Sequence, residues 1–240
     1  MSDHPPAPYH LPLQECFPDV WLARSAIAMS IPLRLTITFS RNMVAVRAPD
    51  GWVLLNPVRL TEEAEAELLA KAPFKHAVRL GTFHGRDDGY YVEKFGVEFW
   101  GVRGEQTYSE PRFSREITEE GPFPIPGARV VIFTHATRAE CVVSLPQHRL
   151  LVTCDSVQHY DRDPLISWLG KVVMYPMGFF TPCVIGPIWL KDVTPPGGSL
   201  RTDFERVLAL DFDHLISAHG TPKIGGAKDA LAKNVERLSR

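Results

Sequence analysis

Two short segments carry residue types that could bind a metal ion. An apolar, β-favouring run at residues 150–153 leads to Asp155, and a second run at residues 215–218 leads to His219. Runs of this kind are typical of strands buried between helices, and ligands at the carboxyl ends of such strands share one edge of the sheet. We therefore expect Asp155 and His219 to lie close together at that edge.

The chemistry available to such a pair is that of a metal centre. Imidazole nitrogens and carboxylate oxygens suit Zn, Fe or Mn ions, and a carboxylate can bridge two ions. Such a centre lowers the pKa of bound water, so that hydroxide is available near neutral pH to attack an ester, thioester, amide or phosphoester. Two ligands at strand ends do not define a reaction, but they indicate where others should be found.

Three further residues stand at comparable places in the chain. His84 and Asp88 share the Gly-rich loop 81–89 after an expected strand at 76–80, and His135 follows an expected strand at 129–134. Each has an ordinary alternative, because such a loop can be a solvated turn and a histidine can end a strand in solvent. Asp87 is expected to cap the next helix. Cys154, His159 and Tyr160 lie close to Asp155 in sequence and could enter the site.

The elements that must position these residues can be traced along the chain. Residues 33–39 alternate in places, and strands at 43–47 and 52–55 flank the turn Ala48-Pro49-Asp50-Gly51, which predicts a β-hairpin. Thr61 is expected to cap a helix with Ala64–Ala72 as its body. Further strands are predicted at 76–80, 97–100, 129–134, 140–145, 149–153 and 215–217, and further helices at 90–95, 200–210 (capped by Ser199) and 227–238.

Composition limits the classes of function. With 240 residues, 45% hydrophobic and 22% charged, the chain is long enough for one globular domain with a sizeable core. A net charge of -2 gives no general attraction to nucleic acid or to an anionic membrane, so we expect neither as a partner. The four cysteines form no C-x-x-C pair and no signal sequence is visible, which together favour a cytoplasmic protein with reduced thiols.

Taken in order, these pieces resemble the metallo-β-lactamase superfamily. That family carries an H-x-H-x-D-H motif, a later His, a bridging Asp after a buried strand, and a last His followed by Gly. Leu-Leu-Val-Thr-Cys-Asp155 is similar to the bridging-Asp strand, and Ile-Ser-Ala-His219-Gly-Thr-Pro matches the last motif closely. The resemblance implies an α/β fold, an αββα sandwich of two mixed sheets flanked by helices. Residues 1–240 would form this single domain, with 1–15 flexible or irregular.

The first motif departs from the family pattern. Counting from His84, the first His and the Asp (Asp88) are kept, but Arg86 replaces the second His and Gly89 the last. A frame shifted by one residue places Asp87 at the Asp position and loses both early histidines, and the sequence does not choose between the two. Arg86 matters in either frame, because a guanidinium fixed near the centre would replace metal charge rather than ligate an ion.

Two functions follow as expectations from the resemblance. The first is a metal-dependent hydrolase of a small ester, thioester or phosphoester, reached beneath the Pro-rich segment 104–127, which could equally be a surface loop. His84, Asp88, His135, Asp155 and His219 would hold one or two divalent ions, Zn foremost with Fe or Mn as alternatives, and Asp155 and Asp88 would be the catalytic carboxylates. The second is a metal-free binding or scaffold protein. A di-iron redox centre is a third option, and the sequence leaves the oligomeric state open.

Overall fold

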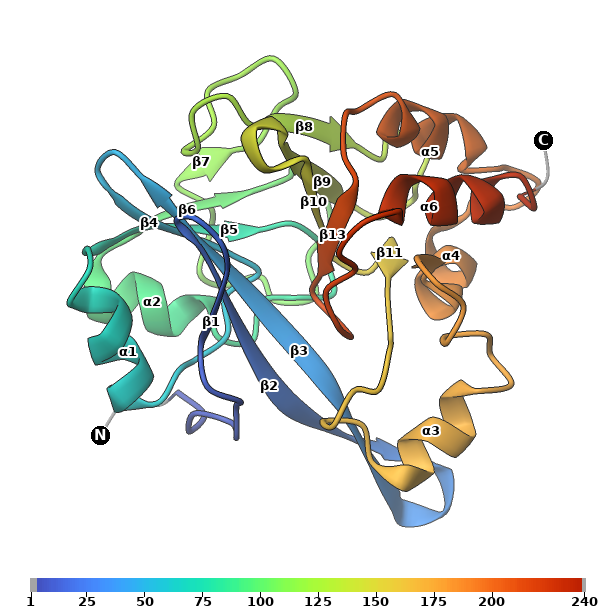
Figure 1. The fold of residues 1–240 in the computed structure, drawn as a ribbon, viewed down its shortest axis with the longest axis horizontal. Helices are drawn as coiled ribbons and strands as arrows, with labels where there is room; N and C mark the ends of the chain where they lie inside the picture. Colours follow the sequence, from blue (N-terminus) through green and yellow to red (C-terminus); the bar gives the residue numbers. More distant parts are fainter. Residues whose placement is uncertain (1–3, 239–240) are drawn as a thin grey trace.

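The computed structural model describes residues 4–238, in which two β-sheets are stacked face to face with helices on both outer faces (Figure 1). The first sheet has the order β1-β2-β3-β4-β5-β6-β7. Its first three pairings are antiparallel and the last three are parallel. Its strands are β1 Gln14–Phe17, β2 Val20–Ile31, β3 Leu35–Ala48, β4 Gly51–Leu55, β5 Phe74–Arg79, β6 Glu98–Gly101 and β7 Arg115–Glu116.

The second sheet has the order β13-β10-β9-β8, with β13 parallel to β10 and the other pairs antiparallel. Its strands are β8 Arg129–Ile132, β9 Cys141–Leu145, β10 Leu150–Thr153 and β13 His214–Ser217. A two-stranded ribbon, β11 Val157–Gln158 and β12 Val184–Ile185, lies beside it. Both large sheets are therefore mixed, which confirms the predicted αββα sandwich.

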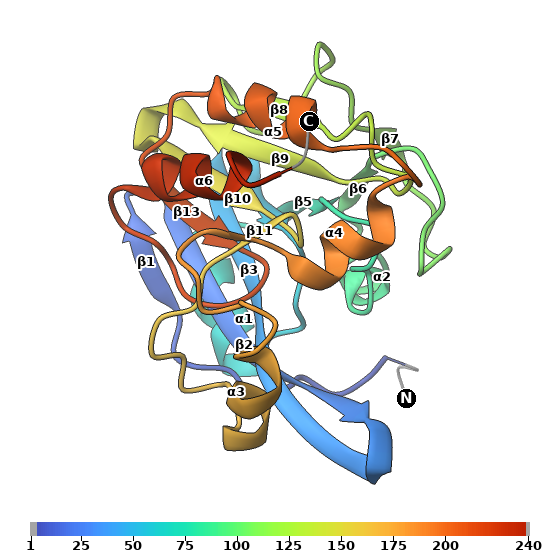
Figure 2. The same ribbon diagram turned by 90° about the vertical axis from the view of Figure 1, so that its right-hand side faces the viewer.

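The helices divide between the two outer faces (Figures 1 and 2). Helices α1 and α2 cover the first sheet, and α4, α5 and α6 lie on the side of the second. The helices are α1 Glu62–Leu69, α2 Asp88–Phe95, α3 Trp168–Met174, α4 Pro187–Val193, α5 Arg201–Leu208 and α6 Ala227–Val235, and short 3-10 turns occupy Pro32–Arg34 and Pro146–His148.

Alternation along the strands builds the layers. In β4, Val53 and Leu55 face the second sheet, whereas Trp52 and Leu54 pack beneath α1 and α2. In β10, Leu150 and Val152 lie in the layer between the sheets, whereas Leu151 packs with α4, α5 and α6. Side chains on successive residues of a strand point to opposite faces, so strands covered on both faces must be apolar at every position.

Strands β2 and β3 form a hairpin that extends well beyond the rest of the first sheet (Figures 1 and 2). Helix α3 lies against this extension, where Thr38 of β3 receives a backbone hydrogen bond from Ser167 and its N–H donates to the Ser167 hydroxyl at 3.1 Å. Ser167 also caps α3 by accepting from Gly170 N–H at 3.1 Å. The hairpin and α3 therefore form one projecting wall.

Most predicted elements are present within a few residues of their expected ends. The turn at Ala48–Gly51 joins β3 to β4, and the Thr61 hydroxyl accepts from Ala64 N–H to cap α1. The expected separation of strands at 33–39 and 43–47 is wrong, because residues 35–39 and 43–47 both belong to β3, whose partner β2 was not predicted. Within residues 4–238, no helix is long and apolar enough to cross a membrane.

Candidate metal centre

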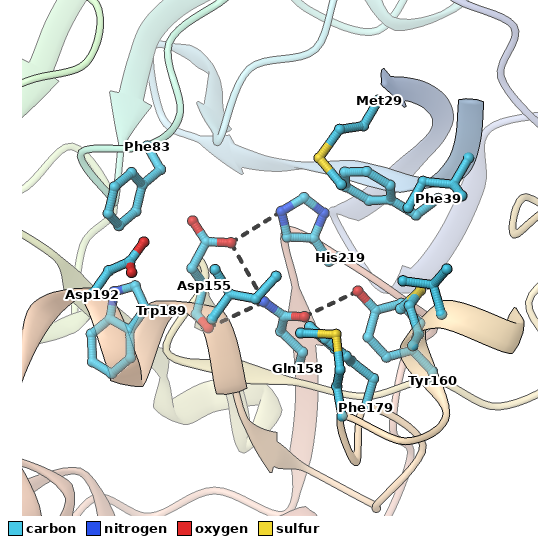
Figure 3. A pocket seen from close by; sticks show the side chains of 15 residues that line it. Met29, Phe39, Phe83, Asp155, Gln158, Tyr160, Phe179, Trp189, Asp192 and His219 are labelled. Carbon is cyan, nitrogen blue, oxygen red and sulfur yellow. Dashed lines mark hydrogen bonds and ion pairs between the residues drawn. The ribbon is translucent and has the colours of Figure 1, made fainter. Parts of the chain in front are cut away.

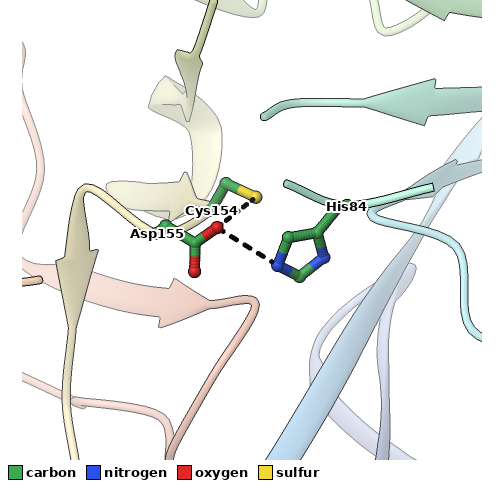
Figure 4. Close-up of side chains that lie close together, drawn as sticks. All are labelled: His84, Cys154 and Asp155. Carbon is green, nitrogen blue, oxygen red and sulfur yellow. Dashed lines mark hydrogen bonds and ion pairs between the residues drawn. The ribbon is translucent and has the colours of Figure 1, made fainter. Parts of the chain in front are cut away.

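Three side chains from distant parts of the chain meet at one end of the sandwich. His219 Nε2 lies 3.1 Å from Asp155 Oδ1, His84 Nε2 lies 3.4 Å from Asp155 Oδ2, and the two imidazole Nε2 atoms are 3.1 Å apart (Figures 3 and 4). The Cys154 thiol lies beside them, with Sγ 3.9 Å from Asp155 Oδ2. All four side chains are largely buried, so their polar atoms face one another and a pocket rather than bulk solvent.

The donor separations fit a single transition-metal ion. Ligand atoms at the Zn–N and Zn–O distances of about 2.0–2.1 Å stand about 3.3 Å apart at the corners of a tetrahedron. The two Nε2 atoms are 3.1 Å apart, and they lie 3.1 Å (His219 to Oδ1) and 3.4 Å (His84 to Oδ2) from the two Asp155 oxygens, all close to that edge length. Two histidines and one carboxylate on one side of an ion form a ligand set that both Zn and Fe(II) accept.

Parallel pairing of β10 and β13 places two of the three donors. Thr153 is in register with Ser217, and Asp155 and His219 each follow two residues later. The Ser217 hydroxyl donates to Cys154 O at 2.8 Å, and Ser156 N–H donates to the Glu140 carboxyl at 2.6 Å. The loop that carries Asp155 is therefore fixed by Ser217 of β13 and by Glu140, the residue just before β9.

Strand β3 holds the loop that carries His219. His219 Nδ1–H donates to the Ser40 carbonyl at 2.7 Å, which leaves the Nε2 lone pair facing Asp155 and His84. Asn42 donates from its amide to the carbonyls of Ser217 and Gly220, at 2.8 and 3.0 Å. Gly220 has φ 85°, and a Cβ there would lie 1.9 Å from the carbonyl oxygen of His159, so only glycine fits.

The titration of these groups favours metal ligation near neutral pH. Burial lowers the pKa of His84, and the Asp155 carboxylate only partly opposes this effect. Burial alone would raise the pKa of Asp155, but the adjacent imidazoles outweigh it and keep the pKa well below the usual aspartate range. His84 is therefore neutral and Asp155 anionic at pH 7, the forms that bind a cation.

Two further ionisable groups beside the centre have a raised pKa. Burial raises the pKa of the Glu140 carboxyl, and the nearby Asp155 charge raises it further. Burial likewise raises the pKa of the Cys154 thiol, with Asp155 and Glu140 adding to the shift. Both shifts favour the neutral forms of Glu140 and Cys154 beside the Asp155 carboxylate.

An apolar pocket of about 220 Å³ opens beside the donors (Figure 3). Asp155, His219 and Gln158 form its polar end, where the Gln158 amide donates to Asp155 Oδ1 at 3.4 Å. Its apolar wall comes from the β2–β3 hairpin, the loop between β5 and α2, helices α3 and α4, and the segment between these two helices: Met29, Ile37, Phe39, Phe83, Val173, Met174, Met177, Phe179, Ile188 and Trp189. The site can therefore hold an apolar group directly against its polar donors.

The structure does not bring Asp88 or His135 to this cluster. Asp88 is buried and pairs with Arg79, whose Nε donates to Asp88 Oδ2 at 2.7 Å. His135 is about half exposed, and its Nδ1 lies 3.2 Å from Asp203 of α5. Both side chains have partners of their own outside the group formed by His84, Asp155 and His219.

The loop between β5 and α2 differs from expectation at two more residues. Asp87 stands at the N-cap position just before α2 but makes no capping bond, because its carboxylate pairs with Arg41 at 2.6 Å. Arg86 is exposed rather than fixed at the centre. The buried guanidinium near His84 is instead Arg41 of β3, which lowers the pKa of His84 slightly further.

The covering of the site also differs from expectation. Of the segment 104–127, only Tyr108 lines a cavity next to the donors. The β2–β3 hairpin, which was not predicted, covers the donors in place of that segment. The consecutive residues Ser40, Arg41 and Asn42 of β3, which hydrogen-bond to the loops that surround the donors, were also not predicted. A polar triplet in the middle of an apolar strand was the available signal, because buried polar side chains need partners.

Comparisons with known proteins identify the fold. No family model and no curated protein matches the chain. Among solved structures, it is similar to a metallo-β-lactamase from Erythrobacter litoralis (14% identity, 94% of this chain and 92% of that chain, TM-score 0.58). It is also similar to FIM-1 from Pseudomonas aeruginosa in its mono-zinc form (12% identity, 97% of this chain and 97% of that chain, TM-score 0.59). A third similar structure is VMB-1 (15% identity, 93% of this chain and 94% of that chain, TM-score 0.61). The chain has the metallo-β-lactamase fold.

Proposed function

We propose that this protein is a metal-dependent hydrolase with a mononuclear site formed by His84, Asp155 and His219. The observation that carries the proposal is the convergence of these three donors, 3.1–3.4 Å apart, at the polar end of an apolar pocket. When bound, a divalent ion such as Zn, Fe or Mn would supply Lewis acidity that polarises a substrate carbonyl and lowers the pKa of water.

The protein's own residues have distinct tasks in this proposal. Asp155 supplies the anionic ligand and, with its oxygens shared between the two imidazoles, orients both of them. Gln158 holds the Asp155 carboxylate, and the Tyr160 hydroxyl in turn donates to Gln158 Oε1 at 3.0 Å. The apolar wall excludes water from one side of the reacting group, which strengthens electrostatic interactions there. The substrate is a small molecule with a hydrolysable bond.

Metal content tests the proposal directly. Protein purified without chelator after growth with added Zn, Fe and Mn is expected to carry close to one equivalent of transition metal by elemental analysis. An Asp155→Asn, His219→Ala double variant should lose the metal and the thermal stabilisation that it provides. His135→Ala is the matched control and should keep both. A wild-type protein without metal would contradict the proposal.

One observation favours the metal-free alternative. His84, Asp155 and His219 already lie within hydrogen-bond range of one another, so a binding pocket could persist on these contacts alone. In that case the double variant would lose ligand affinity without any change in metal content. The same elemental analysis therefore separates the two functions.

A further inference from the structure

The donors Asp155 and His219 line two neighbouring chambers that differ in their cationic residues. The apolar chamber has no lysine or arginine among the described residues that line it. A second chamber of about 290 Å³ shares Met29, Phe39 and Phe83 with the apolar chamber. Its lining adds His84 and two cationic residues, Arg41 and Arg86. Asp155 and His219 line both chambers. A molecule whose middle contacts these donors can therefore place one end in each chamber.

The two arginines of the second chamber differ in their availability. The Arg41 guanidinium is already used, because it pairs with Asp87 at 2.6 Å and donates to Pro57 O at 3.0 Å. Arg86 is exposed and makes no ion pair or hydrogen bond with the residues that the structure describes. Arg86 is therefore an uncompensated positive charge at the edge of this chamber.

The apolar chamber disfavours an anionic group. Its acidic side chains are Asp155 and Asp192, its other polar groups belong to Gln158, Tyr160 and His219, and the remaining wall is aliphatic, aromatic or thioether. Methionine side chains in that wall adapt to chains of different shape. An aliphatic acyl group suits this chamber, whereas a phosphoryl group would bring charged oxygens into a wall without cations.

We propose that the substrates are amphiphilic carboxylic esters or thioesters. The aliphatic acyl chain would lie between the hairpin, α3 and α4, the carbonyl would meet the donors, and an anionic leaving group would lie beside Arg86. Hydrolysis joins a water oxygen to the acyl carbon, breaks the bond from that carbon to the leaving oxygen or sulfur, and releases a carboxylic acid and an alcohol or thiol. This inference rests on the proposed hydrolase function.

Matched probes test each chamber. For the zinc-loaded protein, kcat/KM for 4-(octanoyloxy)benzoate should exceed that for 4-acetoxybenzoate, rising about fourfold per methylene until the chamber is full. The benzoate should exceed the uncharged 4-(octanoyloxy)benzamide by about threefold, the size expected of one exposed ion pair. Equal rates for octanoyl and acetyl esters would overturn the proposal.

Variants assign the preferences to the two chambers. Arg86→Gln should remove the preference for benzoate over benzamide, whereas Arg129→Gln, at an exposed arginine of β8, should keep it. Ile188→Asp, at the exposed mouth of the apolar chamber, should reduce the chain-length preference, whereas Ile224→Asp should not. Retention of the benzoate preference in Arg86→Gln would overturn the anionic half of the proposal.

Binding without turnover separates this inference from the proposed function. The amide analogue 4-(octanoylamino)benzoate, measured by titration calorimetry, should show the same chain-length and charge preferences with no hydrolysis. If the analogue binds with both preferences and no ester is cleaved with Zn, Fe or Mn, the hydrolase function fails while the two-chamber site stands. If esters are cleaved without either preference, the hydrolase function stands and the two-chamber inference is overturned.

Discussion

Asp88→Asn distinguishes a structural ion pair from a metal ligand. Motif order predicts Asp88 as a ligand, whereas the structure buries it against Arg79, with both side chains about 1% exposed. Removing one partner of such a pair leaves the other charge buried without compensation. We therefore expect Asp88→Asn to destabilise the protein while leaving the metal content of the folded fraction unchanged.

The expected magnitude follows from burial. Breaking a buried ion pair by removing one partner costs about 3–5 kcal/mol of unfolding free energy. For a protein of this length, each kcal/mol corresponds to about 2–4 °C in Tm, so a fall of roughly 6–20 °C is expected. Urea unfolding followed by circular dichroism measures the free energy, and elemental analysis measures the metal.

A second variant shows whether the loss comes from the unpaired charge. Arg79→Met combined with Asp88→Leu replaces the whole pair by apolar side chains and should recover most of the stability. Asp155→Asn is the contrasting case, since it should lose the metal. Our assignment is refuted if Asp88→Asn folds with unchanged Tm and loses its metal, because Asp88 would then act as the ligand that the motif suggests.

Three further predictions test how the site is held. Burial lowers the pKa of His84, so as the pH falls below about 6.5 the unfolded chain takes up a proton before the folded protein does. Metal-free protein should therefore have a lower unfolding free energy in urea at pH 5.5 than at pH 7.5. His84→Gln should weaken this pH dependence. Asn42→Ala should lower the unfolding free energy by about 1–3 kcal/mol and weaken zinc affinity about 10- to 100-fold in a competition titration. Asn234→Ala on α6 is the control and should leave the zinc affinity unchanged. Gly85→Ala should lower the unfolding free energy by about 3 kcal/mol in the same urea assay, because φ is 137° and a Cβ would lie 2.6 Å from the Arg79 guanidinium. Gly96→Ala, where φ is 62° and the space around the residue is open, should lower it by about 1 kcal/mol.

The elements predicted well are those whose local pattern and tertiary role agree. β10 is covered on both faces and is apolar at nearly every residue, and the Ala48–Gly51 turn has the residues that its backbone requires. β2 was missed because Arg24 and Ser25 interrupt its apolar pattern. Arg24 pairs with Asp163 at 2.8 Å and Ser25 donates to Arg41 O at 3.0 Å, contacts that come from distant segments and leave no local signal.

The residues of the candidate site can likewise be divided into those with a local sequence signal and those whose position depends on tertiary contacts. Asp155 and His219 could be paired from sequence because the register of two buried parallel strands places them together. The partners of Asp88 and His135 could not be predicted, because they belong to a neighbouring strand and to α5. An acidic residue in such a motif can bind a metal ion only if its carboxylate is not already paired with an arginine. Whether an arginine lies close enough depends on the tertiary fold.

The charge balance around His84 predicts one metal ion rather than two. Two ions about 3.5–4 Å apart share a bridging carboxylate and require further ligands on both sides. The carboxylates nearest His84 in sequence, Asp87 and Asp88, are each neutralised by a buried guanidinium, which leaves Asp155 as the anion at the donors. Titration of metal-free protein with Zn²⁺ should therefore saturate near one equivalent, and His84→Ala should abolish that binding. A second equivalent of similar affinity that survives in His84→Ala would contradict the three-donor site and require ligands from elsewhere in the chain.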